Sequence, residues 1–245
     1  MPGGGPSHGV ADEIAIDERF QGPPGSANGG YAAGRLAGFV EGAAVEVSLR
    51  APVPLGRPLA VRRHTGGAAL LDGDSLIVEA RRAELAADAP APVALADAEE
   101  ASKRFPYLEG HAFPRCFGCG PERSPGDGLR IFAGPVAGRD DVFAGPWTPH
   151  VSLAGDDGLV RPEFVWAALD CSGGCRVANP RSTPPVVLGR IAARIERHVP
   201  AGEPHVVVAW PGEYDGRKRE AGTAVFDADG RLAAVARALW IELRG

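Results

Sequence analysis

Hydrophobic and polar positions alternate in short runs along most of the chain, a pattern that predicts β-strands. Glycine- and proline-rich turns separate the runs, and the sequence DADG at residues 227–230 is typical of a tight hairpin. The runs cover residues 13–20, 44–49, 58–65, 75–83, 128–132, 141–144, 186–198, 205–211, 218–227 and 231–243. Strands this short, joined by turns, favour an antiparallel sheet.

One segment of the first half, residues 28–37 (NGGYAAGRLA), has the spacing of a helix. Small and apolar residues recur at helical intervals from Tyr31 onward, as in a helix that packs closely on another element. Either Ser26 or Asn28 can cap the first turn, because both side chains accept hydrogen bonds from free backbone N–H groups. We therefore expect a short helix here, weakened by its glycines.

A second helix is predicted in residues 161–170 (RPEFVWAALD). Pro162 suits the first turn of a helix, Glu163 favours its positive end, and the apolar residues cover most of its surface. The lone carboxylate of Asp170 falls in this apolar segment, where burial is costly without a reason. We expect the helix to end at residues 171–175 (CSGGC). The plainer alternative to a chemical role is that Asp170 hydrogen-bonds this turn.

The order of elements is similar in the two halves of the chain: strands, one helix, then more strands. This repetition predicts an α+β protein formed by internal duplication. The segment 88–113 begins rich in alanine, proline and acidic residues and is predicted to be a linker. It would join a first unit at residues 10–87 to a second unit at residues 114–245.

The composition excludes several classes of function. With 44% hydrophobic and 23% charged residues, the chain is typical of an ordinary globular protein. Its net charge of −5 offers no basic surface for nucleic acid. The N-terminal sequence lacks the basic and apolar regions of a signal peptide, and no apolar run is long enough to span a membrane. We therefore expect a cytoplasmic protein.

Four cysteines, Cys116, Cys119, Cys171 and Cys175, are too few for a disulfide scaffold in a chain of 245 residues. The spacing Cys116-x-x-Cys119 suits a zinc knuckle. The 51 residues between Cys119 and Cys171, however, are more than compact zinc ribbons use. We therefore expect buried or partly exposed thiols, no bound metal and no cofactor.

The two helical segments together resemble the helices of hotdog-fold acyl-CoA thioesterases, in the PaaI-like branch with an HGG signature. In that family a curved antiparallel sheet wraps one helix, and two such units pair. The helix begins His-Gly-Gly, and an acidic residue follows nine positions after the His. Each site combines the start of one helix with the acid of the other. Residues 114–131 (PRCFGCGPERSPGDGLRI) also resemble a segment before the first strands of some members. The resemblance implies a tandem, or double, hotdog fold.

The signatures of the two halves are complementary. Residues 28–30 (NGG) align with His-Gly-Gly, but Ala37 stands where the acid is expected. In the second half Asp170 aligns with the acid, but residues 161–163 (RPE) replace the signature. The resemblance therefore implies one complete site and one inactive site, with the Asp170 carboxylate and the Gly30 N–H as the catalytic groups.

The resemblance also implies which groups meet the substrate. The Gly30 N–H would polarise the thioester carbonyl, while the Asp170 carboxylate would activate water or attack directly; both routes stay open. We expect room for one thioester group between the Asp170 carboxylate and the Gly30 nitrogen. The plainer alternative is that residues 28–30 form only a cap and a tight turn. The residues predicted to bind the substrate are Asn28, Gly29, Tyr31 and Trp166.

The implied function is a thioesterase-like hydrolase of acyl-CoA thioesters. An alternative is a protein of the same fold that binds acyl-CoA or another apolar ligand without hydrolysis, because the signature His is missing. A hydratase would need an Asp and His pair near a helix start, and a serine hydrolase would need a G-x-S-x-G elbow; the sequence shows neither.

His111 and His150 lie in predicted loops without a Ser or Cys partner at a recognisable spacing. The expected partners are therefore the small-molecule ligand and a second copy of the chain, which would form a homodimer through sheet edges or faces. Nucleic acid and membrane are not expected as partners.

Overall fold

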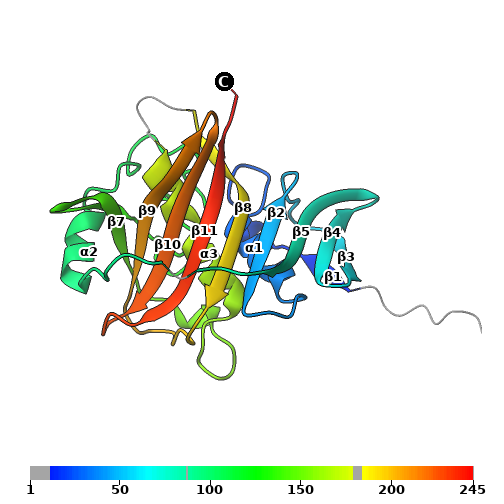
Figure 1. Ribbon diagram of the computed structural model, residues 1–245, viewed down its shortest axis with the longest axis horizontal. Coiled ribbons are helices and arrows are strands. Elements are labelled where there is room, and N and C mark those ends of the chain that lie inside the picture. Colours follow the sequence, from blue (N-terminus) through cyan, green and yellow to red (C-terminus); the bar gives the residue numbers. More distant parts are fainter. Residues whose placement is uncertain (1–11, 87, 179–183, 245) are drawn as a thin grey trace, which may run out of the picture.

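The computed structural model describes residues 12–86, 88–178 and 184–244. The outer limits predicted for the two units, residues 10, 87 and 245, lie outside this set. The described strands form one antiparallel sheet in the order β1-β3-β4-β5-β2-β8-β11-β10-β9-β7-β6 (Figure 1). The first half supplies β1 (Glu13–Ala15), β2 (Ala44–Leu49), β3 (Pro58–His64), β4 (Gly67–Asp72) and β5 (Ser75–Ala83). The second half supplies β6 (Gly134–Val136), β7 (Arg139–Trp147), β8 (Val186–Ile195), β9 (His205–Asp215), β10 (Lys218–Asp227) and β11 (Leu232–Glu242).

The two halves of the sheet meet where β2 pairs with β8, with Val45 opposite Ala193 and Ser48 opposite Arg190. In each half the strand that follows the helix lies at this seam, and the last strand of the half lies next to it. Read outward, the order is β2-β5-β4-β3-β1 on one side and β8-β11-β10-β9-β7 on the other. The two sides therefore place their strands in corresponding positions, with β6 added at the far edge of the second.

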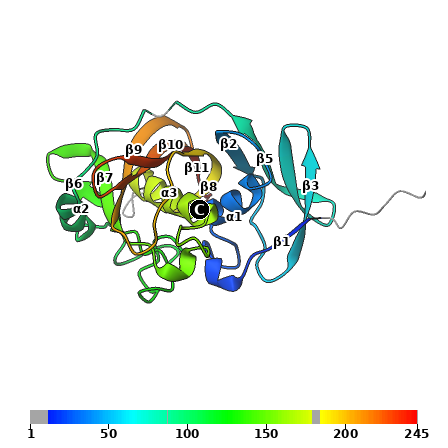
Figure 2. The same cartoon turned by 90° about the horizontal axis from the view of Figure 1, so that it is seen from below.

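Helices α1 (Gly29–Ala37) and α3 (Pro162–Val177) lie side by side on one face of the sheet (Figure 2). Their close approach depends on glycine. A Cβ on Gly30 would lie 2.5 Å from the carbonyl oxygen of Trp166, and one on Gly34 would lie 2.6 Å from Cα of Glu163. The glycines that weaken α1 as an isolated helix thus let it contact α3 along one side.

The opposite face of the second half is also covered. Helix α2 (Leu95–Ser102) and the chain that leads to it cross this face and enclose a separate apolar cluster with Val206, Val208 and Phe226. Because the first part of β9 is buried on both faces, residues 206–210 (VVVAW) form a continuous apolar run instead of alternating. The segment 88–113 thus contains a packed helix, which the sequence pattern did not predict.

Several predicted boundaries are confirmed and several are wrong. The predicted runs 44–49, 75–83 and 218–227 coincide with β2, β5 and β10. By contrast, residues 128–132 form a loop, and β4 lies where a turn was expected. The expectation that α3 ends at the CSGGC sequence is also wrong, because the helix continues to Val177.

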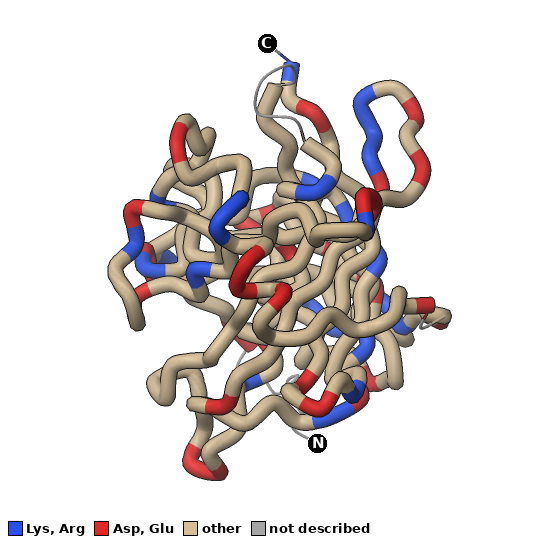
Figure 3. Tube along the Cα trace, turned by 90° about the vertical axis from the view of Figure 1, so that its left-hand side faces the viewer, with Lys and Arg blue, Asp and Glu red and all other residues tan. Residues whose placement is uncertain are grey.

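The small residues of that sequence serve packing. A Cβ on Gly174 would lie 2.7 Å from the ring of Trp240, so only glycine lets β11 approach the helix there. Contact with the sheet outweighs the low helix propensity of glycine. No helix among the described residues is both long and apolar enough to cross a membrane. On the side seen in Figure 3, acidic and basic residues are interspersed.

Candidate active site

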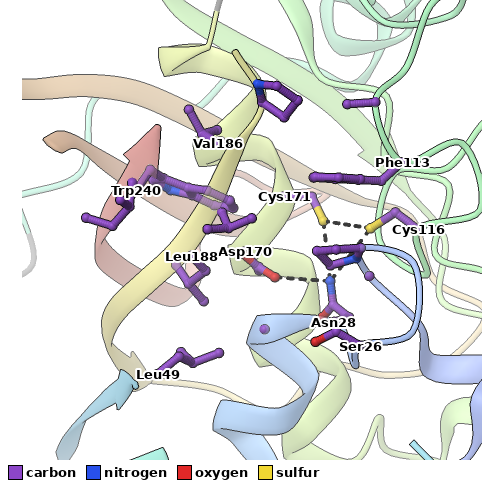
Figure 4. A pocket seen from close by; sticks show the side chains of 18 of the residues that line it. Ser26, Asn28, Leu49, Phe113, Cys116, Asp170, Cys171, Val186, Leu188 and Trp240 are labelled. Carbon is purple, nitrogen blue, oxygen red and sulfur yellow. Dashed lines mark hydrogen bonds between the residues drawn. The ribbon is translucent and has the colours of Figure 1, made fainter. Parts of the chain in front are cut away.

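Asp170 lies in the middle of α3 and is buried against the start of α1 (Figure 4). Its Oδ2 accepts a hydrogen bond from the backbone N–H of Gly30 at 2.8 Å and another from Nδ2 of Asn28 at 3.0 Å. The first turn of a helix carries unpaired N–H groups and the positive end of the helix dipole, which favour a carboxylate. The structure therefore brings together Asp170 and Gly30, which lie 140 residues apart in the sequence.

Asn28 caps α1 and also connects the two halves. Its Oδ1 accepts a hydrogen bond from the N–H of Tyr31 at 2.8 Å, which confirms the predicted cap. Its amide nitrogen donates to Asp170 and also lies 3.5 Å from Sγ of Cys171 and 3.8 Å from Sγ of Cys116. One side chain thus fixes the start of α1, the Asp170 carboxylate and two thiols.

Burial makes the Asp170 carboxyl a weaker acid than an exposed aspartic acid. Loss of hydration raises the pKa of this carboxyl to about 7, against the opposing effect of the hydrogen bonds from Gly30 and Asn28. The second carboxyl oxygen, Oδ1, is buried without a hydrogen-bond partner in the described part of the chain. A carboxyl group that exchanges its proton near neutral pH and has a free oxygen is suited to accepting a proton from water.

The distance between Asp170 and Gly30 differs from the prediction. A 2.8 Å hydrogen bond leaves no room for a thioester group between the carboxylate and the backbone nitrogen. A carbonyl oxygen would therefore have to replace Asp170 Oδ2 as the acceptor of the Gly30 N–H. The reason for the difference is that α1 and α3 are in direct contact at this point.

A cavity of about 500 Å³ adjoins Asp170 and extends between the helices and the sheet. Asn28, Gly29 and Asp170 lie at its wall together with Cys116 and Cys171, and most of the remaining wall is apolar (Figure 4). Its volume falls in the range of small-molecule sites in proteins, which are mostly apolar with a few polar groups. The apolar residues labelled in the figure are Leu49, Phe113, Val186, Leu188 and Trp240.

Three of the predicted site residues do not line the cavity. Tyr31 and Trp166 are in the hydrophobic core, with the Tyr31 ring stacked on Phe20 at 4.2 Å, and neither lines the cavity. Gly30 also lacks contact with the cavity, since the space that its Cβ would fill is taken by Trp166 and Asp170. Gly30 is therefore a glycine for helix packing, while its N–H still faces the carboxylate. Gly29, whose Cβ would meet Leu188, lies at the cavity as expected.

The second potential site, which would combine the start of α3 with residue 37 of α1, lacks the corresponding groups. Ala37 is buried and offers no carboxylate, and the side chain of Arg161, the residue before α3, forms no capping hydrogen bond within the described residues. The two helix starts are thus chemically different, as the complementary sequences predicted.

The four cysteines, expected to be buried or partly exposed thiols, are all buried and lie in one cluster. Sγ of Cys116 is 3.5 Å from Sγ of Cys171, and the sulfurs of Cys116, Cys119 and Cys171 all lie within 4.8 Å of one another. The 51 residues between Cys119 and Cys171, which counted against a shared zinc site, do not keep the two pairs apart, because the fold places residues 116–119 against α3. His111, for which no partner was predicted, has its Nε2 3.3 Å from Sγ of Cys119.

Replacing Asn28 should show how much its capping bond and its bond to Asp170 contribute to the stability of the contact between α1 and α3. Asn28→Ala removes the cap and one hydrogen bond to a buried carboxyl, so we expect the free energy of unfolding to fall by about 3 kcal/mol in urea denaturation. Asn28→Ser keeps a capping oxygen but lacks the amide donor, and should lose about half as much. Equal stability of Asn28→Ala and wild type would contradict this role.

Comparison with known proteins supports the predicted resemblance at the level of the fold. A protein provisionally named thioesterase II from Thermobifida fusca YX has a TM-score of 0.58 and 14% identity, covering 95% of this chain and 92% of that one. The acyl-CoA thioesterase II TesB2 from Mycobacterium marinum has a TM-score of 0.56 and 14% identity, covering 90% of each chain. At this identity the comparison establishes a shared fold, that of hotdog thioesterases, and not an activity.

Another solved structure matches only part of the chain. A thioesterase superfamily protein matches over 50% of this chain and 58% of that one, at 21% identity and a TM-score of 0.43. This chain thus spans less than two thirds of that protein. No protein-family model matches the sequence, and no curated protein matches it.

Proposed function

We propose that the chain is a thioesterase-like hydrolase of acyl-CoA thioesters, with one composite site formed by Asp170 of α3 and by Gly30 and Asn28 of α1. The observation that carries this proposal is the buried Asp170 carboxyl, held by the start of the other helix beside an apolar cavity. The names of the structurally similar thioesterases support the same reaction class. The corresponding strand orders on the two sides of the seam support an internal duplication of two hotdog units.

The reaction would begin when the thioester carbonyl oxygen takes the Gly30 N–H from Asp170. The backbone donor and the dipole of α1 then stabilise the negative charge that forms on this oxygen. Asp170, still held by Asn28, accepts a proton from water as the water oxygen bonds to the carbonyl carbon. The carbon–sulfur bond breaks, and the departing thiolate takes up the proton. Direct attack by Asp170, giving an anhydride that water then cleaves, is the alternative route.

A second candidate is a protein that binds acyl-CoA or another apolar ligand without turnover. The direct hydrogen bond between Asp170 and Gly30 favours it, because the Gly30 N–H already has an acceptor in Asp170 Oδ2. Under this alternative the carboxylate has a structural role, holding the positive end of α1 against α3.

Release of free coenzyme A from a panel of acyl-CoA esters distinguishes the two candidates. The hydrolase should release thiol with at least one acyl group. Thermal stabilisation by acyl-CoA without any thiol release would contradict hydrolysis and favour the binding protein.

Narrowing the cavity should change the preference for acyl length. Val186→Trp places a large ring in the cavity wall, so ligands that need the lost space should bind less well. Displacing two methylene groups costs about 1.6 kcal/mol, which is an increase in KM of roughly 10-fold for long acyl chains but not short ones. Leu76→Trp, at an exposed position away from the cavity, is the matched control. An unchanged chain-length profile would exclude this cavity as the acyl site.

A further inference from the structure

The cysteine cluster has the dimensions of a metal site. In a tetrahedral zinc site with Zn–S bonds of about 2.3 Å, neighbouring sulfurs lie about 3.8 Å apart. The 3.5 Å separation of Cys116 and Cys171 and the 4.8 Å limit for the set with Cys119 are close to this value. All three residues are buried, and none forms a disulfide.

The loop that carries Cys116 and Cys119 turns tightly against α3. A Cβ on Gly118 would lie 2.5 Å from Sγ of Cys171, and one on Gly120 would lie 2.6 Å from the Cys116 nitrogen. Glycine at both positions therefore allows the tight turn and its approach to α3.

His111 donates to the cluster and is not the fourth ligand. Its Nδ1 accepts a hydrogen bond from the N–H of Phe113 at 2.9 Å, so the neutral ring carries its proton on Nε2. That Nε2–H points at Sγ of Cys119. Cys175 is better placed as a ligand, because it lies one helical turn beyond Cys171 on α3 and packs in the same buried cluster as the other three cysteines.

We propose that Cys116, Cys119, Cys171 and Cys175 bind one zinc ion that joins the 114–120 loop to α3. Four thiolate ligands on a buried tetrahedral site are typical of structural zinc. The excess negative charge of four thiolates is offset by the Nε2–H of His111 and the side-chain amide of Asn28. Binding displaces the thiol protons, and the ion fixes the turn of α3 next to Asp170. This inference stands whether or not the chain hydrolyses thioesters.

Metal analysis of the full chain, purified without chelator, tests the proposal. We expect about one zinc per chain by mass spectrometry of the metal, and loss of most of it in Cys116→Ser and Cys171→Ser. Ser172→Ala, a buried neighbour on the same helix outside the cluster, should retain the metal. Zinc-free wild-type protein that also fails to bind added zinc would overturn the site, as would recovery of the cysteines as stable disulfides.

Cobalt substitution of the wild-type protein tests thiolate coordination without relying on folded variants. Wild-type protein with Co(II) should show the intense thiolate-to-cobalt charge-transfer bands and the visible bands of tetrahedral thiolate coordination. Octahedral spectra without thiolate bands would overturn the proposal. Cys175→Ser should bind zinc at least 10-fold more weakly if it removes a ligand, and unchanged affinity would exclude Cys175 as the fourth ligand.

Discussion

Asp170→Asn should lower kcat for acyl-CoA hydrolysis by about 10²- to 10⁴-fold, with little change in KM. The substitution preserves the size of the side chain, and its oxygen can still accept the hydrogen bond from the Gly30 N–H. What it removes is the group that takes a proton from water or attacks the carbonyl. Steady-state kinetics of thiol release, with the folded state checked by circular dichroism, measure the effect.

The control for this variant is Ser172→Ala. Ser172 is also buried on α3, but its hydroxyl has no hydrogen-bond partner among the residues that the structure describes, and it does not line the cavity. Its kcat should stay within about 2-fold of wild type. If folded Asp170→Asn kept full turnover, Asp170 would be only the structural partner of α1 and the proposed mechanism would be wrong.

Gly34→Ala should lower the free energy of unfolding by about 3 kcal/mol. The new Cβ would lie 2.6 Å from Cα of Glu163 and 2.8 Å from Cβ of Trp166, so α1 and α3 would have to move apart. The higher helix propensity of alanine returns only about 1 kcal/mol. The midpoint and slope of urea denaturation measure the change.

Gly38→Ala is the matched control at the end of the same helix. Gly38 has a right-handed helical backbone with φ of −60°, and the nearest heavy atom to its Cβ would be 3.7 Å away. Alanine fits there and restricts the unfolded chain, so stability should rise by about 0.5 kcal/mol. Equal effects of the two substitutions would show that close helix contact does not constrain Gly34.

The sequence predicted those parts of the fold that depend on residues close together in the chain, such as short strands and a helix cap. The alternation in residues 44–49 gave β2 with its observed ends, since Val45 and Val47 are buried while Glu46 and Ser48 lie on the more exposed face. The predicted run 75–83 likewise coincides with β5. Asn28 caps α1 through a bond within its own first turn. Pairing of Asp170 with the start of α1 came instead from the family resemblance, because no local pattern joins residues 140 positions apart.

The errors arise where distant contacts decide the structure. The CSGGC sequence continues α3 because Trp240 of β11 packs on its glycines, and a sequence pattern cannot place Trp240 there. The apolar residues of β4 are bracketed by glycine-rich turns and were assigned to them. The cysteine cluster was missed because its members meet only after α3 has packed beside the 114–120 loop. A helix running through residue 175 would have placed Cys171 and Cys175 on one side and indicated the site.

The covering of the sheet's outer face by α2 has a consequence for assembly. In the first half that same face carries mutually paired charges, such as Glu46 with Arg81 and Arg50 with Glu79, which would lose water on stacking. The edge strands β1 and β6 are three residues each, and β6 contains Pro135, so neither supports a long intermolecular ladder. Both composite-site helices already belong to one polypeptide. The predicted homodimer therefore stays a prediction, and the residues of the proposed site all come from one subunit.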